Sequence, residues 1–180
     1  MVTELVLLRR ARSYDTQALA DIYDRYSPGL YRYAMRLMGE DHLAEECVAE
    51  TFHRFLYALK GGRGPDRHLQ AYLYRVAHNW ITDYYRRHQL PTLPLEPEGL
   101  TNPGSDPQAM LAQQMEKERV RDALRLLTPD QRQVVVLKYL EEWKNHEIAE
   151  AIQKEVGAVK ALEHRALNSL RRLLMKEEMT

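Results

Sequence analysis

Two stretches of the sequence carry side chains whose types and spacing suit contact with nucleic acid. In residues 67–88, Arg67, Arg75, Arg86 and Arg87 lie among Tyr72, Tyr74, Trp80, Tyr84 and Tyr85. Aromatic faces stack unpaired bases and guanidinium groups hold phosphates, so this mixture suits a single strand. Asn79 and Asp83 share a helical face and could bond a base edge. Alternatively, some of these aromatic rings are core residues and Asn79 and Asp83 are plain exposed polar residues.

The second stretch, residues 131–174, has the pattern of two helices joined by a tight turn. Ile148, Ala149 and Ile152 mark the buried stripe of a short helix, which residues 153–157 interrupt. A longer stripe then runs through Val156, Val159, Leu162, Ala166, Leu167, Leu170 and Leu174 and leaves Lys160, His164 and Arg165 outside it. This arrangement is typical of a helix-turn-helix, which places side chains in a DNA major groove. Any helical hairpin with a solvated basic face would give the same pattern.

The sequence lacks the residue patterns of enzymes and metal sites. Cys47 is the only cysteine, which excludes an internal disulfide and a multi-cysteine zinc site; its apolar neighbours indicate a buried structural thiol. The seven histidines have no metal-ligand spacing, and the glycine-rich run 61–64 lacks the lysine and hydroxyl residue of a phosphate-binding loop. No nucleophile has an evident partner. We therefore expect no catalytic residue, no metal and no cofactor.

Charge is balanced over the whole chain but segregated along it. The 26 basic and 26 acidic residues cancel, which counts against binding of nucleic acid by bulk charge alone. Residues 40–50 nevertheless hold five acids and no Lys or Arg, whereas residues 67–88 hold four arginines and one acid. This pattern suits two kinds of partner, one basic and one polyanionic. No stretch resembles a membrane span or a signal peptide, so we expect a cytoplasmic protein without membrane insertion.

A proline-rich segment divides the chain into two helical modules. Residues 91–108 hold five of the eight prolines and are predicted to form an extended, flexible linker. No run alternates with period two, so no sheet is expected. We predict an all-α fold of two small helical domains, residues 1–90 and 109–180, of which the second contains the helix-turn-helix.

Local signals place several helix ends. Asp15 is predicted to cap a helix that breaks or bends at residues 28–29 and stops at Gly39, and Asp41 is predicted to cap the next helix. A loop at residues 61–65 precedes a long helix over about 66–88. The sequence from Thr128 to Gln131 matches a capping box with proline in the first turn.

Four stretches, in this order, resemble the extracytoplasmic-function (ECF) group of the sigma-70 family of RNA polymerase sigma factors. ALADIYDRYSPGLYRYAMRLMG resembles the opening helices of the family, and HLAEECVAETFHRF resembles its acidic polymerase-binding motif. AYLYRVAHNWITDYYRRH resembles the helix that melts and reads the −10 element. Residues 127–174 resemble the domain that reads the −35 element. The resemblance covers residues 14–176 and implies a region 2-like first domain and a region 4-like second domain.

The resemblance implies a transcription initiation factor, without enzymatic activity, that binds core RNA polymerase and directs it to promoters. Glu45, Glu46, Glu50 and Phe52 would bind the clamp helices of the largest subunit, and other contacts would involve the β flap. Single-stranded −10 DNA would meet Arg75, Asn79, Asp83, Arg86 and Arg87, with the loop 61–68 helping to hold a flipped base. Duplex −35 DNA would meet Glu155, Lys160, His164 and Arg165. The linker would thread through the polymerase cleft, and an anti-sigma factor would mask the binding faces.

The sequence departs from the family pattern at a few of these positions. Ala49 stands where the acidic motif usually has Gln, and Leu162 where many members have Arg, so we expect fewer polymerase and −35 contacts. Gln153 replaces a usual Gly, which costs about 1 kcal/mol if the turn needs a left-handed backbone. Glu155 replaces a capping Ser or Thr. Its carboxylate would repel phosphate yet could accept from a cytosine amino group, so we predict an altered −35 preference.

Three other classes of protein fit part of the sequence. A helix-turn-helix repressor would explain residues 128–174 and predicts duplex binding by the isolated protein. A helical enzyme would need a catalytic constellation that the sequence lacks, and an interaction adaptor predicts partner binding without DNA. The linker and the opposite charges also predict that the two domains close on each other in the free protein.

Overall fold

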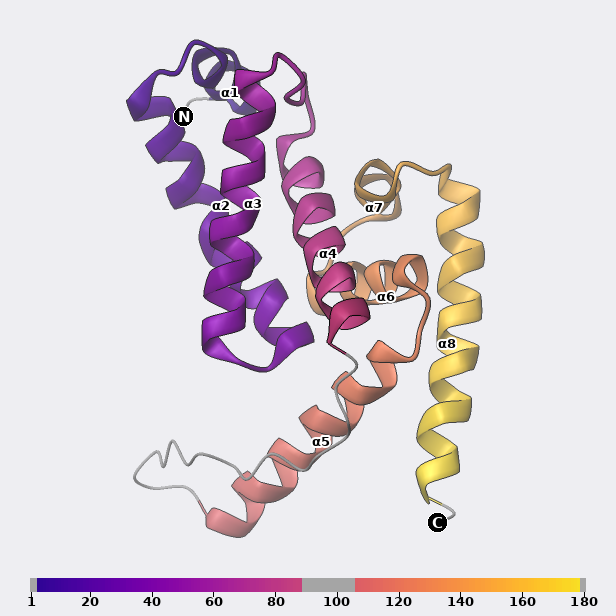
Figure 1. The fold of residues 1–180 in the computed structure, drawn as a ribbon. Helices are drawn as coiled ribbons and strands as arrows, with labels where there is room; N and C mark the ends of the chain where they lie inside the picture. Colours follow the sequence, from indigo (N-terminus) through magenta and orange to yellow (C-terminus); the bar gives the residue numbers. More distant parts are fainter. Residues whose placement is uncertain (1–2, 89–105, 179–180) are drawn as a thin grey trace.

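Every regular element that the structure describes is a helix. The computed structural model describes residues 3–88 and 106–178 (Figure 1). The first module comprises α1 (Glu4–Arg12), α2 (Thr16–Met38), α3 (Asp41–Lys60) and α4 (Leu69–Arg87). The second comprises α5 (Pro107–Arg125), α6 (Pro129–Val135), the π-helix η1 (Val136–Leu140), α7 (Asn145–Ile152) and α8 (Val156–Glu178). The predicted all-α fold is therefore confirmed for these residues, among which no helix is long and apolar enough to cross a membrane.

The predicted linker, residues 91–108, lies outside the described residues up to position 105. Its last two residues belong to α5, a difference from the prediction. Asp106 caps this helix by accepting a hydrogen bond from the backbone N–H of Gln108, and Pro107 occupies the first helical position, where no N–H is needed.

In the first module, α2 and α3 pack side by side, α4 packs across both, and α1 lies against one end of the pair (Figure 1). Asp15 caps α2 as predicted, accepting from two backbone N–H groups, and Gly39 ends it in the left-handed conformation, φ 74°. Of the two outcomes predicted for residues 28–29, a break or a bend, the break is wrong, because α2 is one helix that contains Pro28. Ile22 and Leu30 are fully buried on either side of this proline, so packing holds the helix together.

Two further expectations about helix ends need correction. Asp41 is the first residue of α3, whose N-cap position belongs to Glu40; the Asp41 carboxylate accepts instead from the Tyr31 hydroxyl. The helix expected to begin near residue 66 begins at Leu69, after His68 in the left-handed conformation. No helix was predicted before Asp15, but α1 is present and buries Leu7, Leu8 and Ala11.

In the second module, α8 packs against α5, α6 and α7. The predicted capping box at Thr128 is confirmed: its hydroxyl accepts from the N–H of Gln131, whose side chain accepts in return from the N–H of Thr128. The predicted helix pair is also present as α7 and α8. The turn begins at Gln153, whose φ of 56° shows that the turn does need a left-handed backbone there, so the cost of replacing glycine applies. Because α8 begins at Val156, the turn is shorter than the predicted interruption.

The two modules pack against each other through α4, which contacts both α7 and α6 (Figure 1). Tyr74 of α4 lies against Trp143, with ring centroids 4.8 Å apart. On α2, Arg32 and Arg36 face the carboxylate of Glu141 at 3.3 and 3.6 Å. Closure of the modules is therefore confirmed, although the predicted acidic segment 40–50 does not make these contacts.

A buried histidine connects the modules at this seam. His78 of α4 lies between the Tyr33 hydroxyl, 2.6 Å from Nδ1, and the carbonyl of Pro129, 2.9 Å from Nε2. A carbonyl can only accept, so Nε2 carries the proton and Nδ1 accepts from Tyr33. Burial, together with the nearby Arg132 cation, lowers the pKa of His78 to about 3. The ring is therefore neutral and bonded on both sides.

Candidate functional site

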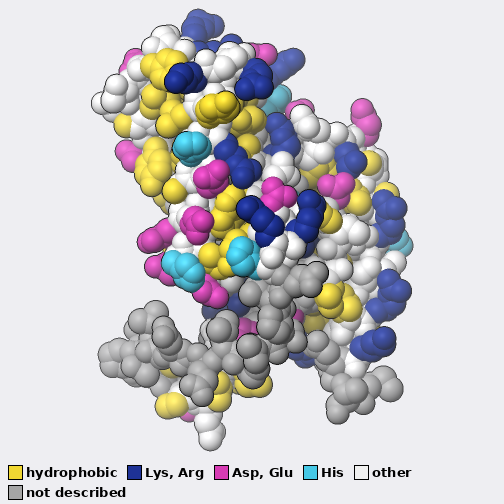
Figure 2. Space-filling view, in the orientation of Figure 1, with side chains coloured by type: hydrophobic (Ala, Val, Ile, Leu, Met, Phe, Trp, Pro, Cys, Tyr) yellow, Lys and Arg dark blue, Asp and Glu magenta, His cyan; other side chains and the backbone are white. Residues whose placement is uncertain are grey.

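An acidic face on α3 is the first candidate surface. Glu45, Glu46 and Ala49 are exposed along one side of this helix, and acidic side chains gather along the edge formed by α2 and α3 (Figure 2). Glu50 is half-buried and accepts from Arg54 Nε at 3.1 Å. Two carboxylates of the predicted set are thus free to meet a basic surface, and a third is partly neutralised within its own helix.

Phe52, predicted for the same surface, is mostly buried. Its side chain is 8% exposed and its ring lies 4.8 Å from that of Tyr23 on α2. Tyr23 is itself exposed. Phe52 therefore supports the acidic face from beneath, and Tyr23 is the aromatic side chain that α2 presents beside it. The sequence pattern did not single out Tyr23 for this face.

The polar side of α4 is the second candidate surface. Asn79, Arg86 and Arg87 are exposed. Asp83 lies 3.7 Å from Arg86, and its backbone carbonyl accepts from Arg87 Nε at 3.4 Å. These four residues form a polar strip in which Arg86 reaches the Asp83 carboxylate with Nη1 and Arg87 reaches the Asp83 carbonyl with Nε, while both arginines stay exposed to solvent. Such a strip can hold phosphates and meet base edges.

The aromatic residues of α4 are mostly used in packing. Trp80 and Tyr74 are buried, and Tyr85 lies beneath the guanidinium groups of Arg125 and Arg132, 5.4 and 4.9 Å from its ring centre. Tyr84 stacks between Trp80 and His88. Tyr72 is the remaining ring and is half-buried. The alternative that these rings are core is therefore correct for most of them, and base stacking is left chiefly to Tyr72.

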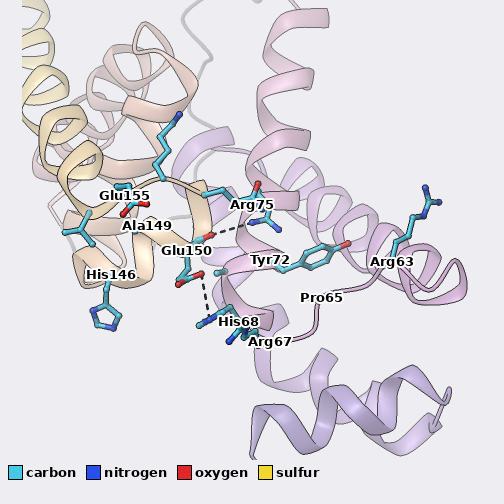
Figure 3. Close-up of a pocket in the computed structure, with 14 residues that line it drawn as sticks. Arg63, Pro65, Arg67, His68, Tyr72, Arg75, His146, Ala149, Glu150 and Glu155 are labelled. Carbon is cyan, nitrogen blue, oxygen red and sulfur yellow. Dashed lines mark hydrogen bonds and ion pairs between the residues drawn. The ribbon is translucent and has the colours of Figure 1, made fainter.

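A groove of about 710 Å³ lies between the two modules and takes in part of each predicted DNA surface. One wall is the loop before α4 and the start of that helix, with Arg63, Pro65, Arg67, His68, Tyr72 and Arg75 (Figure 3). The other wall is α7 and the turn after it, with His146, Glu150, Gln153, Lys154 and Glu155. Arginines and lysine outnumber carboxylates along the groove, so it favours an anion.

Two contacts close this groove at one side (Figure 3). Arg75 Nη1 donates to the backbone carbonyl of Glu150 at 3.5 Å, and the Glu150 carboxylate lies 3.8 Å from His68 Nε2. Arg75 also lies over the Tyr72 ring, 5.6 Å from its centre, and burial lowers its pKa. In this arrangement Arg75, unlike the rest of the predicted −10 set, is engaged with the other module.

The outer side of α8 is the third candidate surface. Lys160, His164 and Arg165 are exposed, and basic side chains form a column along the edge of the molecule where α8 runs (Figure 2). His164 Nε2 lies 3.2 Å from the side-chain amide of Asn168. Beneath this surface, Ile148 and Ala151 of α7 pack with Val159 of α8 in a fully buried layer. This buried layer holds α7 and α8 together, while the basic face of α8 stays exposed to solvent.

Two atypical residues of this module lie in different places. Leu162 is 7% exposed and belongs to the core. Its position does not face solvent, so it is not an exposed site that has merely lost an arginine contact with DNA. Glu155 is exposed just before α8, where its backbone carbonyl accepts from the N–H of Val159 at 3.1 Å. Its side chain lines the groove, on the wall opposite Arg75 (Figure 3).

The predicted site residues therefore form three surfaces rather than one centre, and the two DNA surfaces meet only at the groove, through Arg75 and Glu155. Cys47 is buried as expected, and burial raises its thiol pKa to about 12, so it is not a reactive thiolate. Within residues 3–88 and 106–178, no group of three His, Cys, Asp or Glu side chains could hold a metal ion. Sequence reasoning missed His78, Glu141 and the contacts of α1, because each depends on a partner distant in the chain.

Family models match both modules. Residues 22–90 match sigma-70 region 2, and residues 117–170 match sigma-70 region 4. The first match covers α3, α4 and most of α2, and the second begins within α5 and ends within α8. Each matched segment therefore corresponds to one of the packed helical modules, and α1 lies outside both.

Individual relatives agree with these matches. The ECF RNA polymerase sigma factor BldN of Streptomyces coelicolor is 30% identical over 170 residues, which span 93% of this chain and 64% of BldN. The RNA polymerase sigma-E factor of the same species is 32% identical over 156 residues, 83% of this chain and 82% of that protein. The structure of CnrH in complex with the cytosolic domain of CnrY has a similar fold, with a TM-score of 0.69, 24% identity and coverage of 96% and 97%.

Proposed function

The chain belongs to the sigma-70 family of RNA polymerase sigma factors, in its ECF group, and on this premise we propose which surface makes each of its contacts. A sigma factor is a non-enzymatic initiation factor that binds core RNA polymerase and brings it to promoters through −10 and −35 DNA. The observation that carries the assignment is the separation of charge among the predicted site residues: the exposed carboxylates Glu45 and Glu46 lie on α3, and the exposed cations lie on α4 (Arg86, Arg87) and α8 (Lys160, Arg165).

The acidic face of α3 is proposed to bind the clamp helices of the polymerase largest subunit. Glu45 and Glu46 are exposed carboxylates with no DNA-binding role, since phosphate would repel them. Glu50 is proposed to exchange its bond with Arg54 for one with the polymerase. Phe52 would act indirectly, by supporting Tyr23 at the edge of this face. The β flap is proposed to meet the second module.

The polar strip of α4 is proposed to engage single-stranded −10 DNA. Asn79 and Asp83 would contact base edges, and Arg86 and Arg87 would hold phosphates. Tyr72 and the loop 61–68 would form the wall against which a flipped base rests. Arg75 joins this strip only after its bond to Glu150 breaks, so we propose that the modules separate when the protein engages polymerase and promoter.

The outer face of α8 is proposed to read duplex −35 DNA. Lys160, His164 and Arg165 lie on the exposed side of a helix that a buried layer holds rigidly. Glu155 directly precedes α8 and lines the groove, so it would meet base edges only once the modules separate. Residues 1–90 and 109–180 are thus proposed as a polymerase-binding and −10 domain and a −35 domain, joined by residues 91–108.

The cellular location and the regulator of this protein are proposed from its membership of the same family. Sigma factors act on RNA polymerase in the cell interior, and we propose that this one acts in the cytoplasm. We also propose that an anti-sigma factor holds it inactive. The reported fold likeness is to CnrH in a complex with the cytosolic domain of CnrY. A partner that covers the acidic face and the groove would block both polymerase and DNA.

A charge reversal tests the assignment of the acidic face. Glu46→Lys should weaken binding to purified bacterial core RNA polymerase by about tenfold or more, because like charges would face each other across the interface. Glu142→Lys makes the same change at an exposed position of the second module and serves as the control. Binding is measured by competition against labelled wild-type protein. Equal losses in the two variants would contradict the assignment.

A further inference from the structure

The two ends of helix α1 contact the middle of the segment that joins α3 to α4 and the first residue of α4. At the start of α1, Glu4 Oε1 accepts from the backbone N–H of Leu69 at 3.0 Å, and its Oε2 accepts from the Tyr26 hydroxyl at 2.9 Å. At the other end of α1, Arg12 Nη2 donates to the carbonyl of Pro65 at 3.0 Å. Both residues lie outside the segment 22–90 that matches region 2.

The first turn of α4 lacks a local cap. His68 precedes the helix with φ 55° and ψ 48°, a strained left-handed conformation for a non-glycine residue, and its side chain makes no capping bond. The first N–H groups of a helix have no partner within it and carry partial positive charge. The Glu4 carboxylate supplies both an acceptor and a negative charge. It therefore acts as the N-cap of α4 from another helix.

The segment before α4 is fixed from two further sides. The backbone N–H of Arg63 donates to the carbonyl of Ala58 at 2.9 Å, which ties the segment to the end of α3. Gly64 is pressed on Leu59, since a methyl group at this glycine would lie 2.6 Å from Leu59 Cδ2. The carbonyls of Gly64 and Pro65 and the Asp66 carboxylate then all face the guanidinium group of Arg12.

The same segment forms one wall of the groove. Arg63, Pro65, Arg67 and His68 line it, followed by Tyr72 of α4 (Figure 3). The carbonyls that Arg12 binds and the side chains that line the groove thus belong to the same short run of backbone. A shift of this backbone would move the wall and the first turn of α4 together.

We propose that Glu4 and Arg12 are positioning residues for −10 recognition. Neither residue contacts DNA. They fix the position of the loop 61–68 relative to α4, so that Tyr72 and the loop enclose a flipped base. This inference rests on the proposed role of the loop and α4 in −10 binding. It adds α1 to the −10 apparatus and assigns a task to a helix that lies outside both family segments.

The test compares variants in the holoenzyme reconstituted with bacterial core RNA polymerase. The probes are a fluorescent single strand carrying the −10 sequence of a mapped promoter and a duplex carrying its −35 sequence. Arg12→Ala and Glu4→Ala should lower affinity for the single strand about three- to tenfold, a loss in the range of one ordinary hydrogen bond, because the two residues act on the DNA only through the loop and α4. Affinity for core polymerase and for the −35 duplex should stay within twofold of wild type.

Conservative variants separate positioning from general stability. Glu4→Gln keeps an acceptor for Leu69 and should retain most single-strand affinity, whereas Arg12→Lys keeps the charge but loses the planar fork and should recover only part. Arg9→Ala removes an exposed arginine of the same helix and is the matched control. In the free protein, the Leu69 amide should exchange hydrogen faster in Glu4→Ala than in Glu4→Gln.

Each outcome decides between explanations. If wild-type holoenzyme binds the strand, and Arg12→Ala binds it as tightly as Arg9→Ala, the positioning role is overturned. The proposed role of α4 in −10 binding then stands. Parallel losses of core, −35 and −10 binding would mean that α1 merely stabilises the module, and would also overturn it. If wild-type holoenzyme itself does not bind the −10 strand, the proposed role of α4 fails first, and the positioning role fails with it.

Discussion

Acidification should destabilise this protein through His78, the histidine buried at the seam between the modules. Its ring is bonded to Tyr33 and to the carbonyl of Pro129, and burial lowers its pKa to about 3 from an ordinary value of 6.5. Below pH 6.5 the unfolded chain takes up a proton at this residue that the folded chain cannot accept. The free energy of unfolding is therefore highest above pH 6.5 and falls as the pH falls towards 3.

The size of this effect follows from the gap between the two pKa values. Each pH unit inside the gap costs about 1.4 kcal/mol. Lowering the pH from 7 to 5 crosses about one and a half units of it, so His78 alone should remove about 2 kcal/mol of stability. This is a large part of the roughly 5–15 kcal/mol by which such proteins are usually stable.

Urea unfolding at several pH values measures the effect, with tryptophan fluorescence as the signal. Trp80 and Trp143 are buried in the first and second modules, so each module has a reporter. The comparison is with His78→Gln, because an amide can accept from Tyr33 and donate to Pro129 but does not titrate. Between pH 7 and 5, wild type should lose about 2 kcal/mol more than the variant, whereas above pH 7 the two curves should run parallel.

An equal loss of stability in wild type and His78→Gln would contradict this prediction. It would mean that His78 is protonated or solvated in the folded protein, and hence that the seam is not closed around it in solution. A loss confined to the Trp80 signal would mean that Trp143 and its module respond to pH independently of this contact.

Three further predictions concern the seam and the basic face. Glu141→Gln removes the charge that faces Arg32 and Arg36, and since these arginines are partly exposed, the contact between the modules should weaken by only about 1 kcal/mol. The small-angle scattering profile should become more extended, and a profile identical to wild type would contradict this. Lys160→Ala should weaken −35 duplex binding similarly for all sequences and reduce the slope of log affinity against log salt by about one; an unchanged slope would rule out a phosphate contact. Glu155→Ser should select a different −35 sequence from a randomised pool, and selection of the same sequence would remove Glu155 from base recognition.

Features encoded within a few residues were predictable from the sequence. The capping box at Thr128, the cap at Asp15 and the stop at Gly39 each depend on neighbours three or four positions away, and each is confirmed. At Gln153 the sequence analysis left open whether the turn needs a left-handed backbone, and the structure shows that it does. Hydrophobic periodicity also gave the helical fold, because it depends on one face of each helix at a time.

Features that depend on distant partners were not predictable. Periodicity cannot indicate that α4 packs on two sides, against α2 and α3 and against α6 and α7, and this second burial uses the aromatic rings assigned to base stacking. The side chain of Glu141 is only 3% exposed, yet nothing near it in the sequence reveals that its partners lie on α2. The polar cap that Glu4 gives to Leu69 spans most of the first module. No local pattern encodes such a pair.

Promoter-directed initiation is the most direct test of the whole account. The protein is combined with purified bacterial core RNA polymerase, transcription is started on fragmented genomic DNA, and the 5′ ends of the transcripts are sequenced. Discrete start sites that share −35 and −10 motifs, and that disappear with Glu46→Lys, are the predicted result. If the protein neither binds core nor directs initiation, yet shifts duplex DNA alone, the account is contradicted and the chain acts as a helix-turn-helix repressor.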